Sequence, residues 1–182
     1  DTAPAIAVAC GIVRQRDTDG VVCILTADQL MSDVETFRQT LADAIKVAAR
    51  QDAVVTIGIP PTHAATGFGY IEAGEPLETR TVTLFNKAIR FVEKPDVYTS
   101  ARYLESGRHY WNSGMFIWRT EVMLKALNEH APDLGRLCEA VSGASSADET
   151  QAVLNSAYPS LRSISIDYAV MEKTGIASVV PL

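Results

Sequence analysis

Residues 21–60, VVCILTADQLMSDVETFRQTLADAIKVAARQDAVVTIGIP, contain two apolar runs on either side of a helical segment. The first run, Val21–Leu25, is apolar throughout, as expected for a strand that is covered on both faces. Between Val34 and Arg50 the apolar residues recur at the three- and four-residue spacing of a helix. Ala53–Pro60 is predicted to be a second buried strand. A strand, a helix and a strand of these lengths predict a βαβ unit, whose crossover is almost always right-handed.

The rest of the chain continues the alternation of helices and strands. Strands are predicted within residues 81–95 and at 113–120, and further helices at 2–16, 97–105, 120–130, 132–141, 147–157 and 167–173. Thr2, Ser32, Asp96 and Asp167 are the expected N-caps of four helices, because their side chains can accept a hydrogen bond from a free backbone N–H. There is no internal repeat and no low-complexity linker. The pattern predicts one α/β domain, residues 1–182, with a mostly parallel sheet flanked by helices.

The composition narrows the class of protein. The chain of 182 residues is 47% apolar and 21% charged, so it can bury a core. Its net charge of −6, without any cluster of Lys and Arg, argues against nucleic acid as a partner. Three cysteines (Cys10, Cys23 and Cys138) lack CxxC spacing, which favours a reducing, cytoplasmic compartment. No apolar run is long enough to span a membrane.

Both ends of the chain are unusual. It opens directly in a predicted helix and closes on ASVVPL, a predicted strand. Domains rarely start and stop within core elements, so we expect a fragment that is truncated at both ends. The truncated face should be apolar, and we expect it to associate with another chain, either a second copy or a different partner.

Asp28 is the first candidate for a functional residue. It follows the strand Val21–Leu25, and ligands of open parallel sheets bind beyond the carboxyl ends of the strands. A carboxylate there can bind Mg²⁺, which takes one or two carboxylates and leaves room for phosphate oxygens. The residues support equally the alternative that Asp28 belongs to a turn and binds nothing.

Two further segments contain candidate ligand-binding residues. Gly67 and Gly69 in TGFGY either let the backbone approach a ligand closely or simply form a turn. In FVEKP, Glu93 and Lys94 are adjacent, and adjacent strand residues point to opposite faces. They can face one ligand only if the strand breaks there, which Pro95 would favour; otherwise they are two solvated charges.

The segment RHYWNSGMFIW, residues 108–118, combines aromatic side chains with the amide of Asn112. Aromatic rings and an amide suit a sugar, because rings pack on ring faces and the amide both donates and accepts hydrogen bonds. A loop packed against the core would use the same residues. His63, His109 and His130 form no HxxxH or HExxH pattern, so no zinc site or catalytic triad is visible.

Taken in order, DTAPAIAVA, VVCILTADQLMSD, TGFGYIEAG, FVEKPD, YWNSGMFIW and SIDYAVMEKT resemble the bacterial mannose-1-phosphate guanylyltransferases, also called GDP-mannose pyrophosphorylases. That family includes bifunctional forms joined to a phosphomannose isomerase domain. The resemblance runs over the whole chain; FVEKP is shared more widely among sugar nucleotidyltransferases. It implies a Rossmann-like, GT-A-like fold with a mixed, mostly parallel sheet.

The resemblance implies that mannose 1-phosphate attacks the α-phosphorus of GTP, which yields GDP-mannose and pyrophosphate. Such catalysis consists mainly of positioning and of charge neutralisation by Mg²⁺ and basic side chains. Asp28 matches the family's metal-binding aspartate, and Lys94 the residue that binds the sugar phosphate. These two residues are therefore the expected catalytic residues.

The resemblance also implies binding residues. Gly69 matches the backbone that meets the sugar, while Glu93 and Asn112 would bind the sugar together with Lys94. Three residues at the start of the chain would border the guanine pocket: Thr2, Ala3 and Pro4. Asp167 matches a position in the family without an assigned role.

The chain also departs from the family's pattern. It lacks the glycine-rich GGxGxRLxP loop that holds the triphosphate and the GWxDxG segment that supplies a second metal-binding aspartate. Around Asp28 the family's PADH is TADQ here, with Thr26 and Gln29 as the altered residues, and Asp1 replaces the usual asparagine. We therefore expect this chain alone to be weak or inactive. The alternative is a degenerate, non-catalytic module that binds a sugar phosphate or a partner; a thymidylyl- or uridylyltransferase fragment is disfavoured by YWNSGMF.

Overall fold

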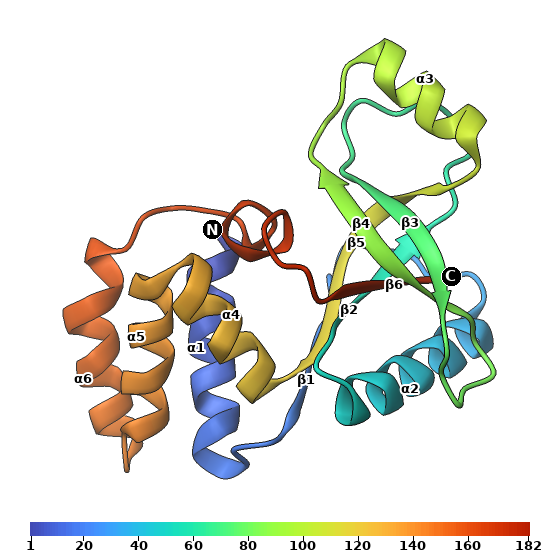
Figure 1. Cartoon of the computed structure of the whole chain (residues 1–182). Coiled ribbons are helices and arrows are strands. Elements are labelled where there is room, and N and C mark those ends of the chain that lie inside the picture. Colours follow the sequence, from blue (N-terminus) through green and yellow to red (C-terminus); the bar gives the residue numbers. More distant parts are fainter. The chain divides into compact units, whose positions relative to one another are not determined.

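A computed structural model describes residues 1–182 as two compact units, each built from separate stretches of the chain (Figure 1). The first unit comprises Asp1–Val22 and Arg119–Thr174, and the second comprises Cys23–Trp118 and Gly175–Leu182. Whether both units act as the single domain that the sequence predicts stays a prediction. None of the helices combines the length and the apolar character that a membrane crossing requires.

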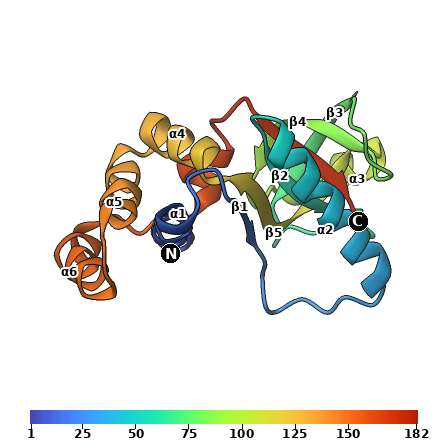
Figure 2. The same cartoon turned by 90° about the horizontal axis from the view of Figure 1, so that it is seen from below.

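The first unit is helical. Its elements are α1 (Thr2–Arg16), α4 (Thr120–His130), α5 (Pro132–Gly143), α6 (Ala147–Ala157) and the short helices η1 (Tyr158–Ser160) and η2 (Asp167–Met171). Helix α5 contacts α1, α4 and α6, and Figure 2 shows it between α4 and α6. The buried side chains at its centre include Cys10, Met123, Leu127, Leu134, Cys138 and Val141.

The second unit is built around a six-stranded sheet. Its elements are β1 (Val21–Ile24), α2 (Val34–Arg50), β2 (Val54–Ile59), β3 (Tyr70–Leu77), β4 (Phe85–Val92), α3 (Val97–Ser106), β5 (His109–Arg119) and β6 (Ala177–Pro181), with β1 and β5 running across the boundary between the units. The strand order is β1-β5-β2-β6-β4-β3. Strand β5 also pairs with β3, through His109–Trp111, and it pairs with β2 between Trp111 and Ile117. Trp111 is thus paired with both strands, and Asn112 follows it directly.

The expectation of a mostly parallel sheet is wrong, although the sheet is mixed as expected. Strands β2 and β6 are parallel, whereas β2–β5, β3–β4, β3–β5 and β4–β6 are antiparallel. Strand β5 also lies between β1 and β2, so the strands of the predicted βαβ unit are not neighbours. The sequence prediction failed because an apolar run indicates only that a strand is buried on both faces, as β2 is. It does not indicate whether the neighbouring strands are parallel or antiparallel.

Two helix N-caps differ from the sequence prediction by one residue. Helix α1 is capped by Asp1, whose carboxylate accepts from the N–H of Thr2. Helix α2 is capped by Asp33 and not by Ser32. In both cases an aspartate stands next to the expected cap, and its carboxylate is the better acceptor for a helix N-terminus.

The other two expected caps have opposite outcomes. Asp96 caps α3 and accepts from the N–H groups of Tyr98 and Thr99, as predicted. The helix ends at Gly107, whose φ of 63° is left-handed. Asp167 is not a cap, because η2 is a single π-helical turn that starts from Ile166 without a side-chain cap.

A buried carboxylate joins α2 to the turn between β3 and β4. Asp43 is fully buried and accepts hydrogen bonds from Lys46, Gln39 and both the N–H and the hydroxyl of Thr83. Burial alone would raise the pKa of Asp43, but the hydrogen bonds from Lys46, Gln39 and Thr83 outweigh it and hold the pKa well below its usual range.

Asp43→Ala should lower the free energy of unfolding by about 2–4 kcal/mol, because the half-buried donors of Thr83 and the ammonium group of Lys46 lose their acceptor. Glu35→Gln, on the exposed side of the same helix, is the control and should change it by less than about 0.5 kcal/mol. Urea unfolding of both variants measures the difference. Since the pKa of Asp43 is depressed, its contribution is present above the unfolded-state pKa of about 4 and is lost as the pH falls further. Equal midpoints for Asp43→Ala and the parent would contradict this role.

Candidate functional site

Three of the predicted sugar-binding residues meet at the end of the β3–β4–β5 part of the sheet. A Cβ at Gly69 would lie 2.6 Å from Oε2 of Glu93 and 3.5 Å from Cβ of Asn112. The N–H of Asn112 donates to the carbonyl of Gly69 at 2.8 Å. Any side chain at position 69 would occupy the space of the Glu93 carboxylate, so glycine is what allows this arrangement.

Lys94 belongs to the same cluster because the chain breaks out of strand geometry there. Strand β4 ends at Val92, and Lys94 has φ 45°, the left-handed region that side chains with a Cβ rarely adopt. As a result Nζ of Lys94 lies 3.2 Å from Oε1 of Glu93. The two side chains therefore lie on one side of the backbone, which fits the single-ligand alternative and not two charges on opposite faces. The Lys94 side chain remains 64% exposed, against 23% for Glu93, so the ammonium group is available to a ligand.

Strand β5 fixes Asn112 through its neighbour. The hydroxyl of Ser113, a buried residue, donates to the carbonyl of Ile57 at 2.6 Å and so ties β5 to β2. The side-chain oxygen of Asn112 accepts from the N–H of Gly114 at 3.1 Å. Ser113 was not singled out by sequence reasoning, since a serine in a strand gives no signal of its partner.

Asp28 is exposed in a bend beyond the end of β1. Its neighbour Gln29 donates from Nε2 to the carbonyl of Ser113 at 2.6 Å, and a Cβ at Gly114 would lie 3.3 Å from the methyl group of Thr26. The loop that carries Asp28 thus lies against the part of β5 next to Asn112. Of the two altered residues around Asp28, Gln29 makes the hydrogen bond that holds the loop there, and Thr26 lies beside Gly114.

The donor set around Asp28 is small. The structure contains no group of three or more His, Cys, Asp or Glu side chains that could hold a metal ion. An oxygen-liganding cation such as Mg²⁺ takes one or two carboxylates and completes its shell with water and phosphate oxygens. A single exposed carboxylate fits such an ion only together with a phosphorylated substrate.

An aromatic cluster adjoins the site. The ring of Trp111 meets the rings of His63 and Phe68 edge-on, at centroid distances of 4.9 and 5.1 Å. The hydroxyl of Tyr70 holds the same loop by donating to the carbonyl of Ala65 and accepting from its N–H. The run of aromatics in the sequence signalled Trp111, but its contacts with residues 63 and 68 depend on how this loop folds.

The expected nucleotide-binding residues belong to the first unit. Ala3 and Pro4 are buried within α1, whereas Thr2 is exposed. The hydroxyl of Thr2 accepts from the N–H of Ile166, and the N–H of Ala3 donates to the carbonyl of Ile164. These contacts hold the start of α1 against residues 164–166, and a role in binding guanine stays a prediction.

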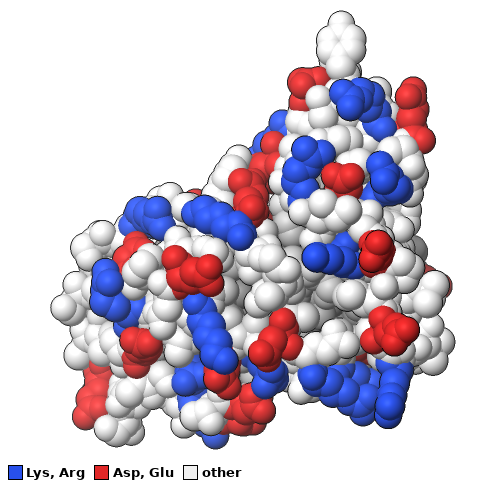
Figure 3. Space-filling model, in the orientation of Figure 1, with Lys and Arg blue, Asp and Glu red and all other residues white.

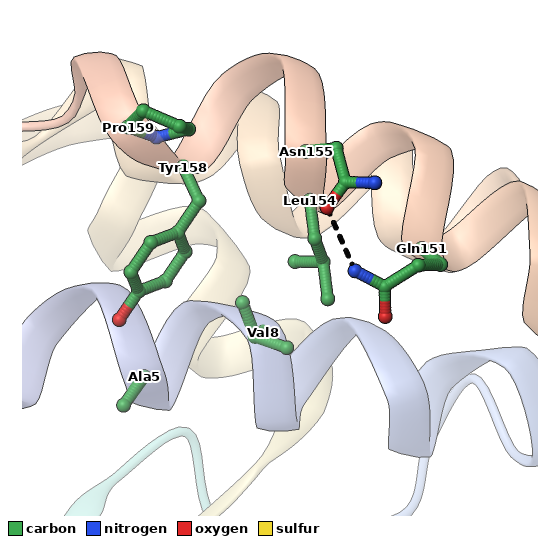
Figure 4. Close-up of a pocket in the computed structure, with 7 residues that line it drawn as sticks. All are labelled: Ala5, Val8, Gln151, Leu154, Asn155, Tyr158 and Pro159. Carbon is green, nitrogen blue, oxygen red and sulfur yellow. Dashed lines mark hydrogen bonds between the residues drawn. The ribbon is translucent and has the colours of Figure 1, made fainter.

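The first unit also contains a groove of about 750 Å³ between α1 and the α6–η1 segment (Figure 4). Its lining is mostly apolar: Ala5, Val8, Leu154, Tyr158 and Pro159, together with the amides of Gln151 and Asn155, which hydrogen-bond to each other at 2.8 Å. It contains no charged side chain and none of the predicted site residues. A sugar phosphate would find no partner for its charge there.

The left-handed backbone at Lys94 predicts an unusual order of stability among its variants. Lys94→Gly should be more stable than Lys94→Val by about 1–2 kcal/mol, because only the residue with a Cβ is strained at φ 45°. The matched control is Lys87, an exposed residue within β4, where valine should be more stable than glycine. Urea unfolding of the four variants measures both differences. If glycine and valine rank alike at the two positions, the left-handed backbone at Lys94 is wrong.

Comparison with known proteins addresses the family of the chain. The model of the nucleotidyl transferase family matches residues 1–156. The xanthan biosynthesis protein XanB of Xanthomonas campestris pv. campestris is 42% identical, with all of this chain and 38% of that protein covered. The mannose-1-phosphate guanylyltransferase of Salmonella muenchen is 40% identical, again with all of this chain and 38% of that protein covered.

Among solved structures, a protein titled mannose-1-phosphate geranyltransferase from Thermus thermophilus superposes with a TM-score of 0.83 at 29% identity, over the whole chain and 50% of that protein. A structure titled mannose-6-phosphate isomerase from Helicobacter pylori gives 0.78 at 28% identity, over the whole chain and 68% of that protein. The chain thus spans under two-fifths of the length of the curated relatives. The family model and these relatives agree, and the chain belongs to the nucleotidyl transferase family.

Proposed function

We propose that this chain is the sugar-phosphate-binding part of a mannose-1-phosphate guanylyltransferase, which forms GDP-mannose and pyrophosphate from GTP and mannose 1-phosphate. The observation that carries the proposal is the cluster of Gly69, Glu93, Lys94 and Asn112 at the end of β3, β4 and β5. The proposal is also supported by comparison, because the whole chain is 40% identical to part of a mannose-1-phosphate guanylyltransferase.

The cluster has the chemistry that a hexose 1-phosphate requires. The carboxylate of Glu93 accepts hydrogen bonds from sugar hydroxyls, and the amide of Asn112 can donate and accept. Because Gly69 has no side chain, the carboxylate of Glu93 can lie beside its backbone, where the sugar is proposed to bind. The exposed ammonium group of Lys94 would leave Glu93 and pair with the phosphate, which carries more negative charge than a carboxylate.

In the proposed reaction, a phosphate oxygen of mannose 1-phosphate forms a bond to the α-phosphorus of GTP, and the bond from that phosphorus to pyrophosphate breaks. Lys94 orients the attacking phosphate and reduces its charge, so that two anions can approach each other. Asp28 would hold a divalent cation, for which Mg²⁺ is the best-fitting candidate, and the bound cation would neutralise phosphate charge. Thr2, Ala3 and Pro4 are proposed to border the guanine.

The alternative, a non-catalytic module that binds a sugar phosphate, draws on a specific observation. Asp28 has no second carboxylate in a ligand cluster, and its neighbour Gln29 is engaged with the backbone of Ser113. The two functions share the sugar site and differ only in turnover. Binding and turnover must therefore be measured separately.

Binding of mannose 1-phosphate should depend on the space at Gly69. Gly69→Ala should weaken binding by about tenfold or more, because the new methyl group displaces the carboxylate of Glu93. The matched control is Gly67→Ala, two residues away, where a Cβ meets nothing within 4 Å. Isothermal titration calorimetry with mannose 1-phosphate measures both.

Since the displaced group is the end of a flexible side chain, Gly69→Ala should keep the thermal unfolding midpoint of the parent. Equal affinity of the two alanine variants would overturn the assignment of the sugar site. Glucose 1-phosphate serves as the second ligand, and equal affinity for both sugars would count against mannose.

Turnover separates the enzyme from the binding module. With GTP, mannose 1-phosphate and Mg²⁺, we expect this chain to release pyrophosphate slowly if at all, because a lone carboxylate holds the cation poorly. Pyrophosphate release in a coupled assay measures the rate, with Asp28→Asn as the inactive reference. Turnover at ordinary nucleotidyltransferase rates, about 1 per second or faster, would refute the expectation of a weak chain.

A further inference from the structure

The helical unit contains two cysteines that meet in its core. Cys10 on α1 and Cys138 on α5 are both fully buried, and the proposed function uses neither thiol. The S–H of Cys10 has two acceptors beside it, the carbonyl oxygen of Thr120 at 3.5 Å and the sulfur of Cys138. The two sulfur atoms are therefore within hydrogen-bonding reach of each other, although their residues belong to different helices.

A glycine brings the two helix backbones together at this point. A Cβ at Gly11 would lie 2.7 Å from the carbonyl oxygen of Cys138 and 2.8 Å from Cβ of Val141, which is closer than such atoms approach in proteins. A disulfide requires Cα atoms about 4.4–6.8 Å apart, so the two backbones that it joins must be close. The missing side chain of Gly11 allows the close packing that a bridge between α1 and α5 needs.

A cation acts on the same two thiols. Arg14 follows Cys10 by one turn of α1, and its positive charge favours the thiolate form of both cysteines. Its Nη1 donates to the carbonyl of Thr18 at 3.2 Å, whereas its buried Nε has no hydrogen-bond partner. The hydrogen bond from Cys10 and the charge of Arg14 lower the pKa of Cys138 against the effect of burial. The same hydrogen bond and burial raise the pKa of Cys10, so Cys138 is the better source of a thiolate nucleophile.

We propose that Cys10 and Cys138 form an oxidation site, which hydroperoxides convert into a disulfide between α1 and α5. The thiolate of Cys138 attacks one oxygen of hydrogen peroxide, the O–O bond breaks, and the hydroxide that leaves takes up the thiol proton as water. The sulfur of Cys10 then attacks the sulfur of the resulting sulfenic acid. An S–S bond replaces the S–O bond, and the leaving hydroxide takes the proton of Cys10 as a second water. The two thiols lose two electrons, which the peroxide gains.

The buried position determines the product of the oxidation. Both thiols are inaccessible in the closed structure, so peroxide reaches them when the helical unit opens locally. Helix α6 packs on α5 and contains no buried residue, which makes it the most weakly held helix of this unit. When the unit closes again, the sulfenic acid lies against the thiol of Cys10 and away from further peroxide, which favours the disulfide over sulfinic acid.

The oxidant for the test follows from the surface of the unit. The face of the helical unit in Figure 3 carries Lys and Arg among Asp and Glu, so it does not attract one sign of charge. Hydrogen peroxide is small and neutral, and it therefore needs no such attraction to enter.

The test identifies the disulfide that hydrogen peroxide produces in the folded chain. After oxidation, the remaining thiols are alkylated in denaturant, and the unreduced peptides are mapped by mass spectrometry. In the folded chain, Cys10–Cys138 should exceed Cys10–Cys23 by about tenfold or more, whereas in urea the shorter loop should make Cys10–Cys23 the more abundant. Cys23, which is half-buried in β1, should be oxidised to sulfinic acid in the folded chain.

Two glycine variants test the close packing. Gly11→Ala should lower the yield of the Cys10–Cys138 disulfide several-fold, because the new methyl group forces α1 and α5 apart. Gly143→Ala is the matched control at the end of α5, where a Cβ meets nothing within 4 Å, and it should leave the yield unchanged.

The oxidised parent chain provides a second measurement. Its thermal unfolding midpoint should lie several degrees above that of the reduced chain, and dithiothreitol should reverse the rise, because the bridge closes a long loop of the unfolded chain. Absence of the Cys10–Cys138 bridge from the oxidised folded chain, an equal share of Cys10–Cys23, or equal yields from the two alanine variants would each overturn the inference.

Discussion

The close approach of three strands at Gly69 is the constraint on which the candidate site depends. Only a residue without a side chain lets the Glu93 carboxylate lie against the backbone just before β3, and the carbonyl of Gly69 accepts from the N–H of Asn112 on β5. The left-handed turn at Lys94 then brings the one cation of the cluster to the same side. The cluster thus depends on the left-handed backbone of Lys94 and on the missing side chain of Gly69. Backbone outliers such as Lys94 tend to occur at functional sites.

The two parts of the site differ in how they are supported. Asn112 is held by β5, which is paired on both sides and tied to β2 through the buried hydroxyl of Ser113. Asp28, in contrast, stands in an exposed bend whose attachment to β5 is the hydrogen bond from Gln29. Sites built on strands are more precise than sites on loops. The sugar cluster is therefore preorganised, while the carboxylate depends on what binds next to it.

Local features were predictable from the sequence, and long-range ones were not. Helices α4 and α6 begin and end as the pattern predicts, and Asp96 and Gly107 bound α3 by the chemistry of their side chains. The break after Glu93 was foreseeable from the proline that follows. Strand direction was not, because burial of β2 on both faces is compatible with parallel and antiparallel neighbours. The contact of Gly69 with Glu93 needs the register of β3 against β4, which no local pattern encodes.

The position of β6 has a consequence for how the second unit forms. This strand lies between β2 and β4, and residues 93–176, including most of the first unit, are made before it. During synthesis, β2 and β4 therefore each keep one unpaired edge until β6 is made. Until then, Val179 and Val180 are also missing from the core. Pairings between such distant segments are slow to form, and β2 and β4 cannot be joined through β6 until β6 has been made. A chain that is released before β6 has paired would expose the open edges of β2 and β4, which favours association between chains.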